Sequence, residues 1–208
     1  MSCNGSAMAI DASIPGDGGC PAGALAGPGR HRLFVQGHEA EPLADGSYPL
    51  LHDHALCDDA VFVDDLNGDG IWQPGEEPLP LGPAPLVHGE HFLVGVGAFA
   101  EFTTSICGDL GPSVVLYIPN YDETGSRALH RLLVARDGVE QPIAEAIDEE
   151  AGQNGYNPFV RVIDGIDPDA TAGDRLVLRS TNLNGIPFSV MVWRPPSEYE
   201  SWIVVEVR

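Results

Sequence analysis

Residues 129–147, LHRLLVARDGVEQPIAEAI, give the clearest indication of the fold. Two runs within this stretch, Leu129–Ala135 and Gln141–Ile147, carry Leu, Val or Ile at alternating places, as half-buried β-strands do. Asp137–Gly138 lies between them, and this dipeptide is typical of a tight turn between antiparallel strands. The stretch therefore predicts a β-hairpin.

Strand-like runs of the same kind recur along the rest of the chain, separated by turn signals about every 8–14 residues. Nine further runs are predicted as strands: His31–Gln36, Ala60–Asp64, His91–Gly97, Ala100–Ser105, Ser113–Ile118, Phe159–Ile163, Arg175–Ser180, Pro187–Trp193 and Trp202–Val207. Short strands at this spacing are typical of two packed antiparallel sheets. We therefore expect an all-β protein, an antiparallel β-sandwich of immunoglobulin-like or jelly-roll-like type, with only Ser126–Ala135 and Ile143–Ala151 as short alternative helices.

The first 29 residues differ in composition from the rest of the chain. They are rich in Gly, Ala, Pro, Ser and Asp and contain no aromatic residue, so they bury too little apolar surface to become ordered. We expect residues 1–29 to form a disordered, flexible tether and residues 30–208 to form the sandwich. A loop near residues 108–112 could divide the sandwich into two, but each part would then have few strands, so one sandwich is favoured.

The four cysteines, Cys3, Cys20, Cys57 and Cys107, are widely spaced and form no C-x-x-C pair. This spacing favours disulfides, and hence a secreted or cell-surface protein, over a zinc ribbon or a redox pair. We expect Cys57 to pair with Cys107, although three connectivities are open and four free thiols in a cytosolic protein are the alternative. Cys3 near the start resembles the lipid-attachment cysteine of bacterial lipoproteins, which would imply a membrane-anchored protein.

The charge of the chain excludes several functions. There are 31 acidic residues against 10 basic ones, a formal net charge of −21, and every basic residue is an arginine. Nucleic acids and anionic membranes are therefore unfavourable partners, and lysine-based Schiff-base or phosphate-loop chemistry is impossible. No stretch reaches 18 apolar residues, so no transmembrane segment is predicted. The nucleophile pattern G-x-S-x-G is missing too, which argues against a serine hydrolase.

The segment Asp65–Glu76, DLNGDGIWQPGE, matches the twelve-residue calcium-loop pattern D-x-[DN]-x-[DN]-G-x5-E. A Ca²⁺ ion binds six to eight oxygen atoms, and the pattern turns such oxygens toward one point around a glycine, here Gly70. The predicted metal ligands are Asp65, Asn67, Asp69, the carbonyl of Ile71, Gln73 through water, and Glu76. The sequence therefore predicts one Ca²⁺ site, with a solvated hairpin tip at Asn67–Gly70 as the alternative.

The flanks of this loop do not favour the two helices of an EF-hand. A strand-like run, Ala60–Asp64, precedes it, and five prolines between residues 74 and 85 follow it. The loop resembles the D-x-N-x-D-G loops of dockerins, of thrombospondin type 3 repeats and, most closely, of calcium-bound β-sandwich modules in bacterial surface adhesins. This resemblance implies a Ca²⁺ ion that ties strands together.

Two other groups of residues could bind metals. Four histidines with one acid between them could hold zinc or copper and activate water for hydrolysis: His52, His54, His88, His91 and Glu90. Solvated histidines are the expected alternative. Four acids could hold a second Ca²⁺ ion, although their spacing fits no standard loop and acidic turn residues explain them as well: Asp164, Asp167, Asp169 and Asp174.

Three aromatic residues near the C-terminus, Trp193, Tyr199 and Trp202, could form a sugar-binding platform, with packing of Trp193 and Trp202 in the core as the favoured alternative. From these features we expect an extracellular, calcium-stabilised, non-catalytic β-sandwich module for adhesion or ligand binding, with a surface protein or a glycan as its ligand. A carbohydrate-binding module is the alternative, and a histidine-metal hydrolase is a third hypothesis.

Overall fold

The computed structural model describes residues 21, 23–36, 43, 47–52, 61–64, 89–93, 96–120, 125–149, 157–166, 168–186, 188–192 and 201–208. These residues form twelve β-strands and no helix: β1 (Gly29–Gln36), β2 (Ser47–His52), β3 (Val61–Asp64), β4 (Gly89–Leu93), β5 (Phe99–Ser105), β6 (Leu110–Asn120), β7 (Ala128–Arg136), β8 (Val139–Asp148), β9 (Asn157–Asp164), β10 (Arg175–Asn182), β11 (Phe188–Val192) and β12 (Trp202–Val207). The all-β prediction is confirmed. Every predicted strand overlaps an observed one, and the two alternative helices are wrong, because Ser126–Ala135 overlaps β7 and Ile143–Ala151 overlaps β8.

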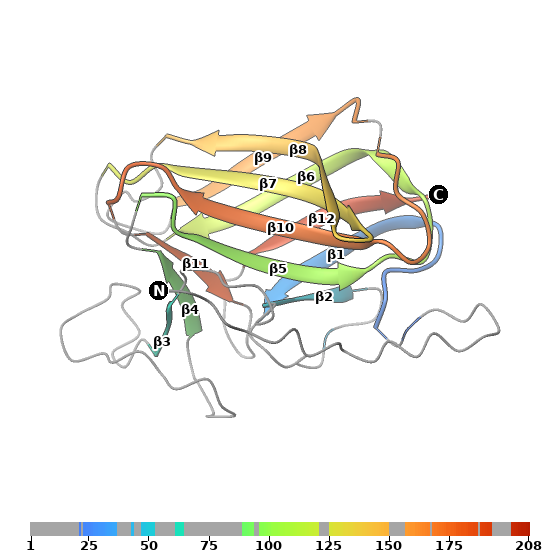
Figure 1. Ribbon diagram of the computed structural model, residues 1–208, viewed down its shortest axis with the longest axis horizontal. Helices are drawn as coiled ribbons and strands as arrows, with labels where there is room; N and C mark the ends of the chain where they lie inside the picture. The colour runs from blue at the N-terminus through green and yellow to red at the C-terminus, as the bar shows by residue number, and fades with distance from the viewer. Residues whose placement is uncertain are drawn as a thin grey trace.

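Nine strands form one sheet in the order β8-β7-β10-β5-β2-β1-β12-β6-β9, and β11, β4 and β3 form a second, smaller sheet. The large sheet curls into two layers, with β8, β7, β10 and β5 in front of β9, β6, β12 and β1 (Figure 1). We call these groups the front half and the back half. The predicted β-sandwich is confirmed, with one correction: β1 and β2 pair in parallel, so the sheet is mixed rather than purely antiparallel.

The hairpin predicted from residues 129–147 is formed by β7 and β8. The two strands pair antiparallel from Ala128↔Asp148 to Arg136↔Val139, with a bulge between Leu132 and Leu133. Asp137 and Gly138 take positive φ values of 51° and 78° at the turn. Two consecutive positive φ values are what the tight turn of a two-residue hairpin requires, and Asp-Gly tolerates them.

The core lies between the two halves of the sheet. On β12 the pattern alternates, so that Ile203, Val205 and Val207 are buried while the residues between them are only half-buried. The other half contributes Phe102, Leu132 and further side chains that are fully buried. Phe188 of β11 is also fully buried and joins the same hydrophobic cluster. Each such side chain contributes about 1.5–3 kcal/mol by leaving water.

The N-terminal boundary of the sandwich was predicted incorrectly. Leu25, inside the expected tether of residues 1–29, is fully buried. Its N–H donates to the Ser105 carbonyl at 2.8 Å, and its carbonyl accepts from the Cys107 N–H at 2.8 Å. The packed part of the chain therefore begins before β1, and the remaining tether prediction, residues 1–20, lies outside the described residues.

Strands from both sides of residues 108–112 pair within the same sheet, since β1 pairs with β12 and β5 with β10. The described strands of the large sheet thus form one sandwich. Cys107 is disulfide-bonded, while Cys3, Cys20 and Cys57 are outside the described part, so the pairing of Cys57 with Cys107 stays a prediction. No helix long and apolar enough to cross a membrane occurs in the described ranges.

Candidate functional site

The predicted calcium ligands Asp65, Asn67, Asp69, Ile71, Gln73 and Glu76 all lie outside the described residues. The structure does show the element that precedes them. β3 ends at Asp64 and pairs antiparallel with β4, so a strand, as predicted, leads toward this segment. The calcium site itself stays a prediction of the sequence.

The four-histidine metal hypothesis receives no support from the described residues. His52 is 8% exposed, and its ring packs against Phe102 with centroids 5.8 Å apart. His91 belongs to β4 of the small sheet, whereas His52 belongs to β2 of the large one. His54 and His88 are outside the described part. Within that part, no three His, Cys, Asp or Glu residues are grouped so as to hold a metal ion.

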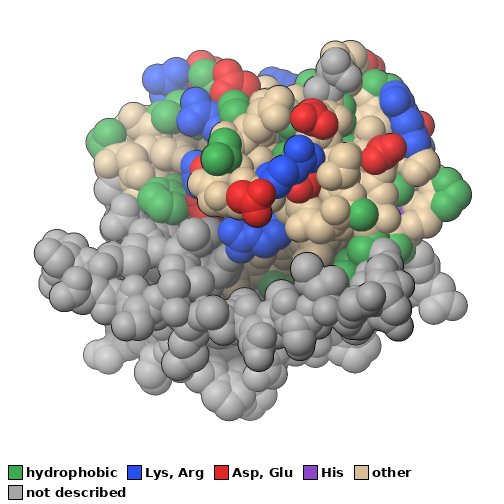
Figure 2. All heavy atoms as spheres, turned by 45° about the vertical axis from the view of Figure 1, so that its right-hand side comes forward, with side chains coloured by type: hydrophobic (Ala, Val, Ile, Leu, Met, Phe, Trp, Pro, Cys, Tyr) green, Lys and Arg blue, Asp and Glu red, His purple; other side chains and the backbone are tan. Residues whose placement is uncertain are grey.

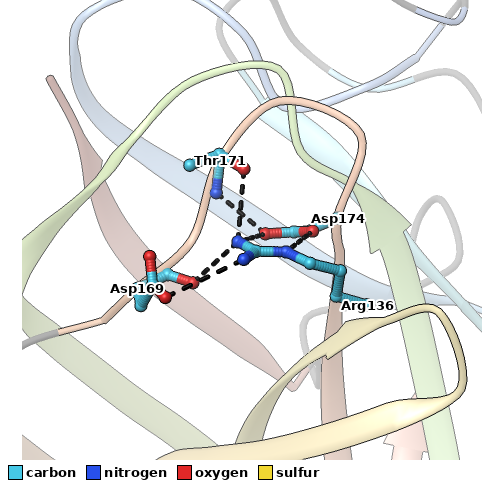
Figure 3. A network of polar contacts seen from close by, with 4 residues as sticks. All are labelled: Arg136, Asp169, Thr171 and Asp174. Carbon is cyan, nitrogen blue, oxygen red and sulfur yellow. Dashed lines mark hydrogen bonds and ion pairs between the residues drawn. The ribbon is translucent and has the colours of Figure 1, made fainter.

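The hypothesis of a second calcium site is contradicted at Asp174, and Asp167 of the same set lies outside the described residues. Both carboxylate oxygens accept hydrogen bonds from Arg136, each at 2.7 Å, and one also accepts the Thr171 N–H at 2.9 Å (Figure 3). The hydrogen bond from Arg136 holds the pKa of Asp174 below its ordinary value, although burial opposes this shift. Arg136 also bonds the Asp169 carbonyl at 3.0 Å. An arginine therefore takes the place in which a cation was expected, and it fastens the 169–174 loop to the hairpin.

A serine and a histidine lie within hydrogen-bonding distance in the core, as a nucleophile and its base would. His130 Nδ1 is 2.9 Å from Ser180 Oγ, but both residues are fully buried. Burial lowers the pKa of His130 from 6.5 to about 3. Because no substrate reaches this pair and the histidine stays neutral, its role is structural.

The outer face of the back half is the strongest candidate for ligand binding. On each strand of this half, alternate side chains point away from the core, and register aligns them in rows. Val160 and Val162 of β9 are 43% and 62% exposed. We call the following set the back face: Arg32, Val115, Tyr117, Val160, Val162, Trp202 and Val204.

An aromatic stack occupies this face. The rings of Tyr117 and Trp202 are parallel within 3°, with centroids 4.5 Å apart, and the Arg32 guanidinium lies 4.6 Å from the Trp202 centroid. Since β1 and β6 flank β12 on opposite sides, Arg32 and Tyr117 cover opposite faces of the indole. The stack therefore presents the edges of its planar groups to solvent, rather than one flat ring.

This arrangement changes the predicted sugar platform. Trp193 and Tyr199 lie outside the described residues, and the partner of Trp202 is instead Tyr117. Sequence analysis did not single out Tyr117 because it is 85 positions away from Trp202 and is marked only by its alternation within β6. Trp202 is half-buried on the outer face, so the expectation that it packs in the core is wrong.

Arg32 is exposed and has no carboxylate partner among the described residues. The front half differs, because Arg127, Arg131, Arg136 and Arg179 all form ion pairs there. Acidic and basic side chains lie next to one another in the view of Figure 2. Arg30, Arg161 and Arg208 likewise have no carboxylate partner among the described residues, and what distinguishes Arg32 is its contact with Trp202 on the back face.

Comparisons with known proteins relate the chain only to solved structures. No family model matches the sequence, and no curated protein does. Among the structures, the CBM36-1 domain of a multidomain xylanase from the hindgut metagenome of Trinervitermes trinervoides is 12% identical, with a TM-score of 0.38 over 58% of this chain and 79% of that one.

Two further structures show how broad this similarity is. A carbohydrate-binding module CBM36 in complex with calcium and xylotriose is 12% identical, with a TM-score of 0.35 over 56% of this chain and 79% of that one. The Eiger TNF from S. frugiperda is 15% identical, with a TM-score of 0.33 over 53% of this chain and 64% of that one. Proteins of such different kinds match about equally, so this similarity does not distinguish among functions, and the back face itself is the evidence for one.

Proposed function

We propose that this protein is a non-catalytic β-sandwich module that binds a carbohydrate on its back face. The observation that carries this proposal is the row formed by the half-buried rings of Tyr117 and Trp202 and the exposed Arg32, beside the exposed valines of β9. The proposal keeps the expected non-catalytic ligand-binding module, and it takes a carbohydrate, the alternative to an adhesion ligand, as the class of ligand.

The chemistry of the back face suits a sugar. A pyranose has apolar C–H groups on its ring and hydroxyl groups around it, so its binding surface needs apolar area next to hydrogen-bonding groups. Val160 and Val162 supply the apolar area, while Tyr, Trp and Arg each combine an apolar body with a polar tip. These three residue types are also enriched where proteins bind partners.

The carbohydrate proposal is tested by titrating the protein with a panel of neutral and acidic oligosaccharides in a calorimeter. Binding should weaken at least about tenfold in Trp202→Ala and in Tyr117→Ala, since stacked aromatic residues dominate such interfaces. Val139→Ala is the matched control, because Val139 is 70% exposed but lies at the start of β8, outside the back face. Binding that both aromatic variants leave unchanged, or no binding to any sugar, would overturn the proposal.

We further propose that residues 65–76 bind one Ca²⁺ ion that stabilises the fold, and that the protein acts outside the cell. The calcium proposal is supported by the twelve-residue pattern and by the strand that ends at Asp64. The extracellular location is supported by the disulfide at Cys107, because disulfides are rare in the cytosol.

Melting the protein with calcium and then with chelator tests the metal site. An ion at 100 times its dissociation constant stabilises the folded state by about 2.7 kcal/mol, so the melting temperature should rise measurably with calcium. Asp69→Ala should abolish this rise, whereas Glu145→Gln, at an exposed ion pair of the front half, should retain it. Equal melting temperatures with calcium and with chelator would refute the site.

A further inference from the structure

Resting on the carbohydrate-binding function proposed above, we infer that the back face selects glycans that carry carboxylate groups, and that Arg32 recognises them. The inference comes from a juxtaposition: the exposed guanidinium of Arg32 lies on an aromatic ring, on the face where ligand binding is proposed. The arginines that form ion pairs in the described residues lie on the front half instead.

Stacking leaves the hydrogen-bonding edge of Arg32 available. The guanidinium lies 4.6 Å from the centroid of Trp202 and 5.8 Å from that of Phe34. The N–H groups of a guanidinium lie within its plane, so contact between its face and a ring leaves them able to donate hydrogen bonds. A guanidinium held in this way binds a carboxylate through two parallel hydrogen bonds with little loss of side-chain freedom.

The neighbouring carboxylate on this face is turned away from Arg32. Glu206 of β12 is in register with Arg30 of β1. Arg30 is the residue before Arg32 on the same side of β1. Its side chain lies over Gly111 of β6, where an added Cβ would come within 2.7–2.8 Å of it. Since β6 is on the far side of β12 from β1, Gly111 gives Glu206 room to lean away from the arginines.

The arginines of the front half show what a paired arginine looks like in this protein. Acidic residues outnumber arginines by 31 to 10, so an arginine on this protein is easily neutralised. Four arginines of the front half are neutralised in this way, and Arg179 contacts two carboxylates, those of Glu101 and Glu140. Arg30, Arg161 and Arg208 also have no carboxylate partner in the described part, so the position of Arg32 is what matters. Arg32 lies on the ring of Trp202, on the face that carries exposed valines, and this position suits an anionic ligand that also has an apolar surface, as a hexuronate does.

The net charge of −21 limits the form of the ligand. Repulsion between the protein and a long polyanion is screened beyond about 8 Å at physiological ionic strength, so the contact at Arg32 decides the affinity for a short acidic oligosaccharide. Short ligands in 0.15 M salt are therefore the appropriate probes.

The test is a titration with trisaccharides of glucuronate, galacturonate and mannuronate, each compared with its carboxyl-reduced counterpart. We expect at least one hexuronate trisaccharide to bind about tenfold more tightly than its reduced form. Arg32→Gln should remove this preference, so that each acidic trisaccharide binds no more tightly than its reduced form, and Arg32→Lys should restore only part of it. Arg131→Gln, at an exposed pair of the front half, should behave as the original protein.

The outcomes separate this inference from the function on which it rests. Equal binding of acidic and reduced sugars, still lost in Trp202→Ala, would overturn the inference and leave the carbohydrate function standing. A carboxylate preference that Arg32→Gln retains would also overturn it. Binding of none of these sugars or of the neutral panel would overturn both.

Discussion

The two halves of the large sheet use the same residue types in opposite ways on their outer faces. On the front half, Leu133, Ala135 and Val177 form a buried cluster outside the main core, and arginines are paired with carboxylates. On the back half, Val160 and Val162 stay exposed, and Arg32 lies on aromatic rings instead. The apolar cluster of the front face is thus buried, whereas the valines of β9 on the back face are left exposed.

The hairpin of β7 and β8 is what closes the front face. Glu140, next to the turn, accepts two hydrogen bonds of 2.8 Å from Arg179 of β10, and Arg136 reaches the 169–174 loop. Arg179 lies two places from Val177 on β10, on the same side of the strand, so its pair with Glu140 lies beside the small apolar cluster. Nothing in the described part of the chain does the same for β9, which is the edge strand of the back half. Differences in stability between matched variants of the two halves should therefore be large.

The largest effect is expected for arginine replacement. Glu101 is 1% exposed and bonded to Arg179, so Arg179→Ala leaves a buried charge without this partner and should cost about 3 kcal/mol of unfolding free energy. Arg32→Ala, which removes an exposed cation–π contact, should cost no more than about 1 kcal/mol. Urea unfolding of both variants measures the difference, and equal costs would mean that the two halves do not differ in this way.

Valine replacement should sharpen the comparison. Val177 of the front half is 1% exposed and Val162 of the back half is 62% exposed. Val177→Ala should lower the unfolding free energy by about 2 kcal/mol, because it leaves a cavity, while Val162→Ala should change it by less than about 0.5 kcal/mol. A large loss at Val162 would indicate that the back face is covered, contrary to the proposal. Chemical denaturation of both variants provides the measurement.

The Arg136 network gives a smaller, pH-dependent effect. Asp174→Asn removes the charge that Arg136 binds and should cost about 1.5 kcal/mol at pH 7, whereas Asp169→Asn, with a side chain 76% exposed, should cost less than about 0.5 kcal/mol. Because the pKa of Asp174 is lowered in the folded protein, its contribution is present above the ordinary carboxyl pKa and is lost as the pH falls below it. Asp174→Asn should therefore match the original protein in strong acid, and a constant gap at every pH would argue against the ion pair.

The smallest effect is expected where the two halves meet, at His130. In the unfolded chain His130 takes up a proton near pH 6.5, while burial lowers its pKa in the folded protein to about 3. The stability that depends on neutral His130 is therefore fully present above pH 6.5 and is lost as the pH falls toward 3. Between pH 6 and pH 5 the loss should be about 1 kcal/mol. His130→Gln should flatten this slope, measured by urea unfolding at several pH values. The same slope in both proteins would show that His130 is protonated in the folded state.

Much of the fold could be predicted because alternation is a local property. The hairpin at residues 129–147 was predicted from the sequence of that segment alone, and the structure has its two strands and its turn. β2 was missed, since Ser47–His52 is short and contains Pro49. Its parallel pairing with β1 could not be predicted either, because neighbours in a sheet are chosen by long-range packing rather than by the pattern within a strand.

In the candidate site, too, the contacts between residues distant in sequence could not be predicted. Arg32, Tyr117 and Trp202 come from three strands that are distant in sequence, and their stacking depends on the register of β1, β12 and β6. The acidic residues at 164, 167, 169 and 174 suggested a bound cation, and folding brought Arg136 to Asp174 instead.

By itself, the sequence determined that the chain forms β-strands and turns, that its surface is strongly acidic, and that residues 65–76 carry a calcium pattern, because each of these depends on residues close together in the chain. Only the tertiary structure decided which strands became neighbours, which outer face buried its apolar side chains, and which of the described arginines were paired with carboxylates. Those outcomes depend on which side chains meet across the sheet, and the pairing of distant strands, not local propensity, brings them together.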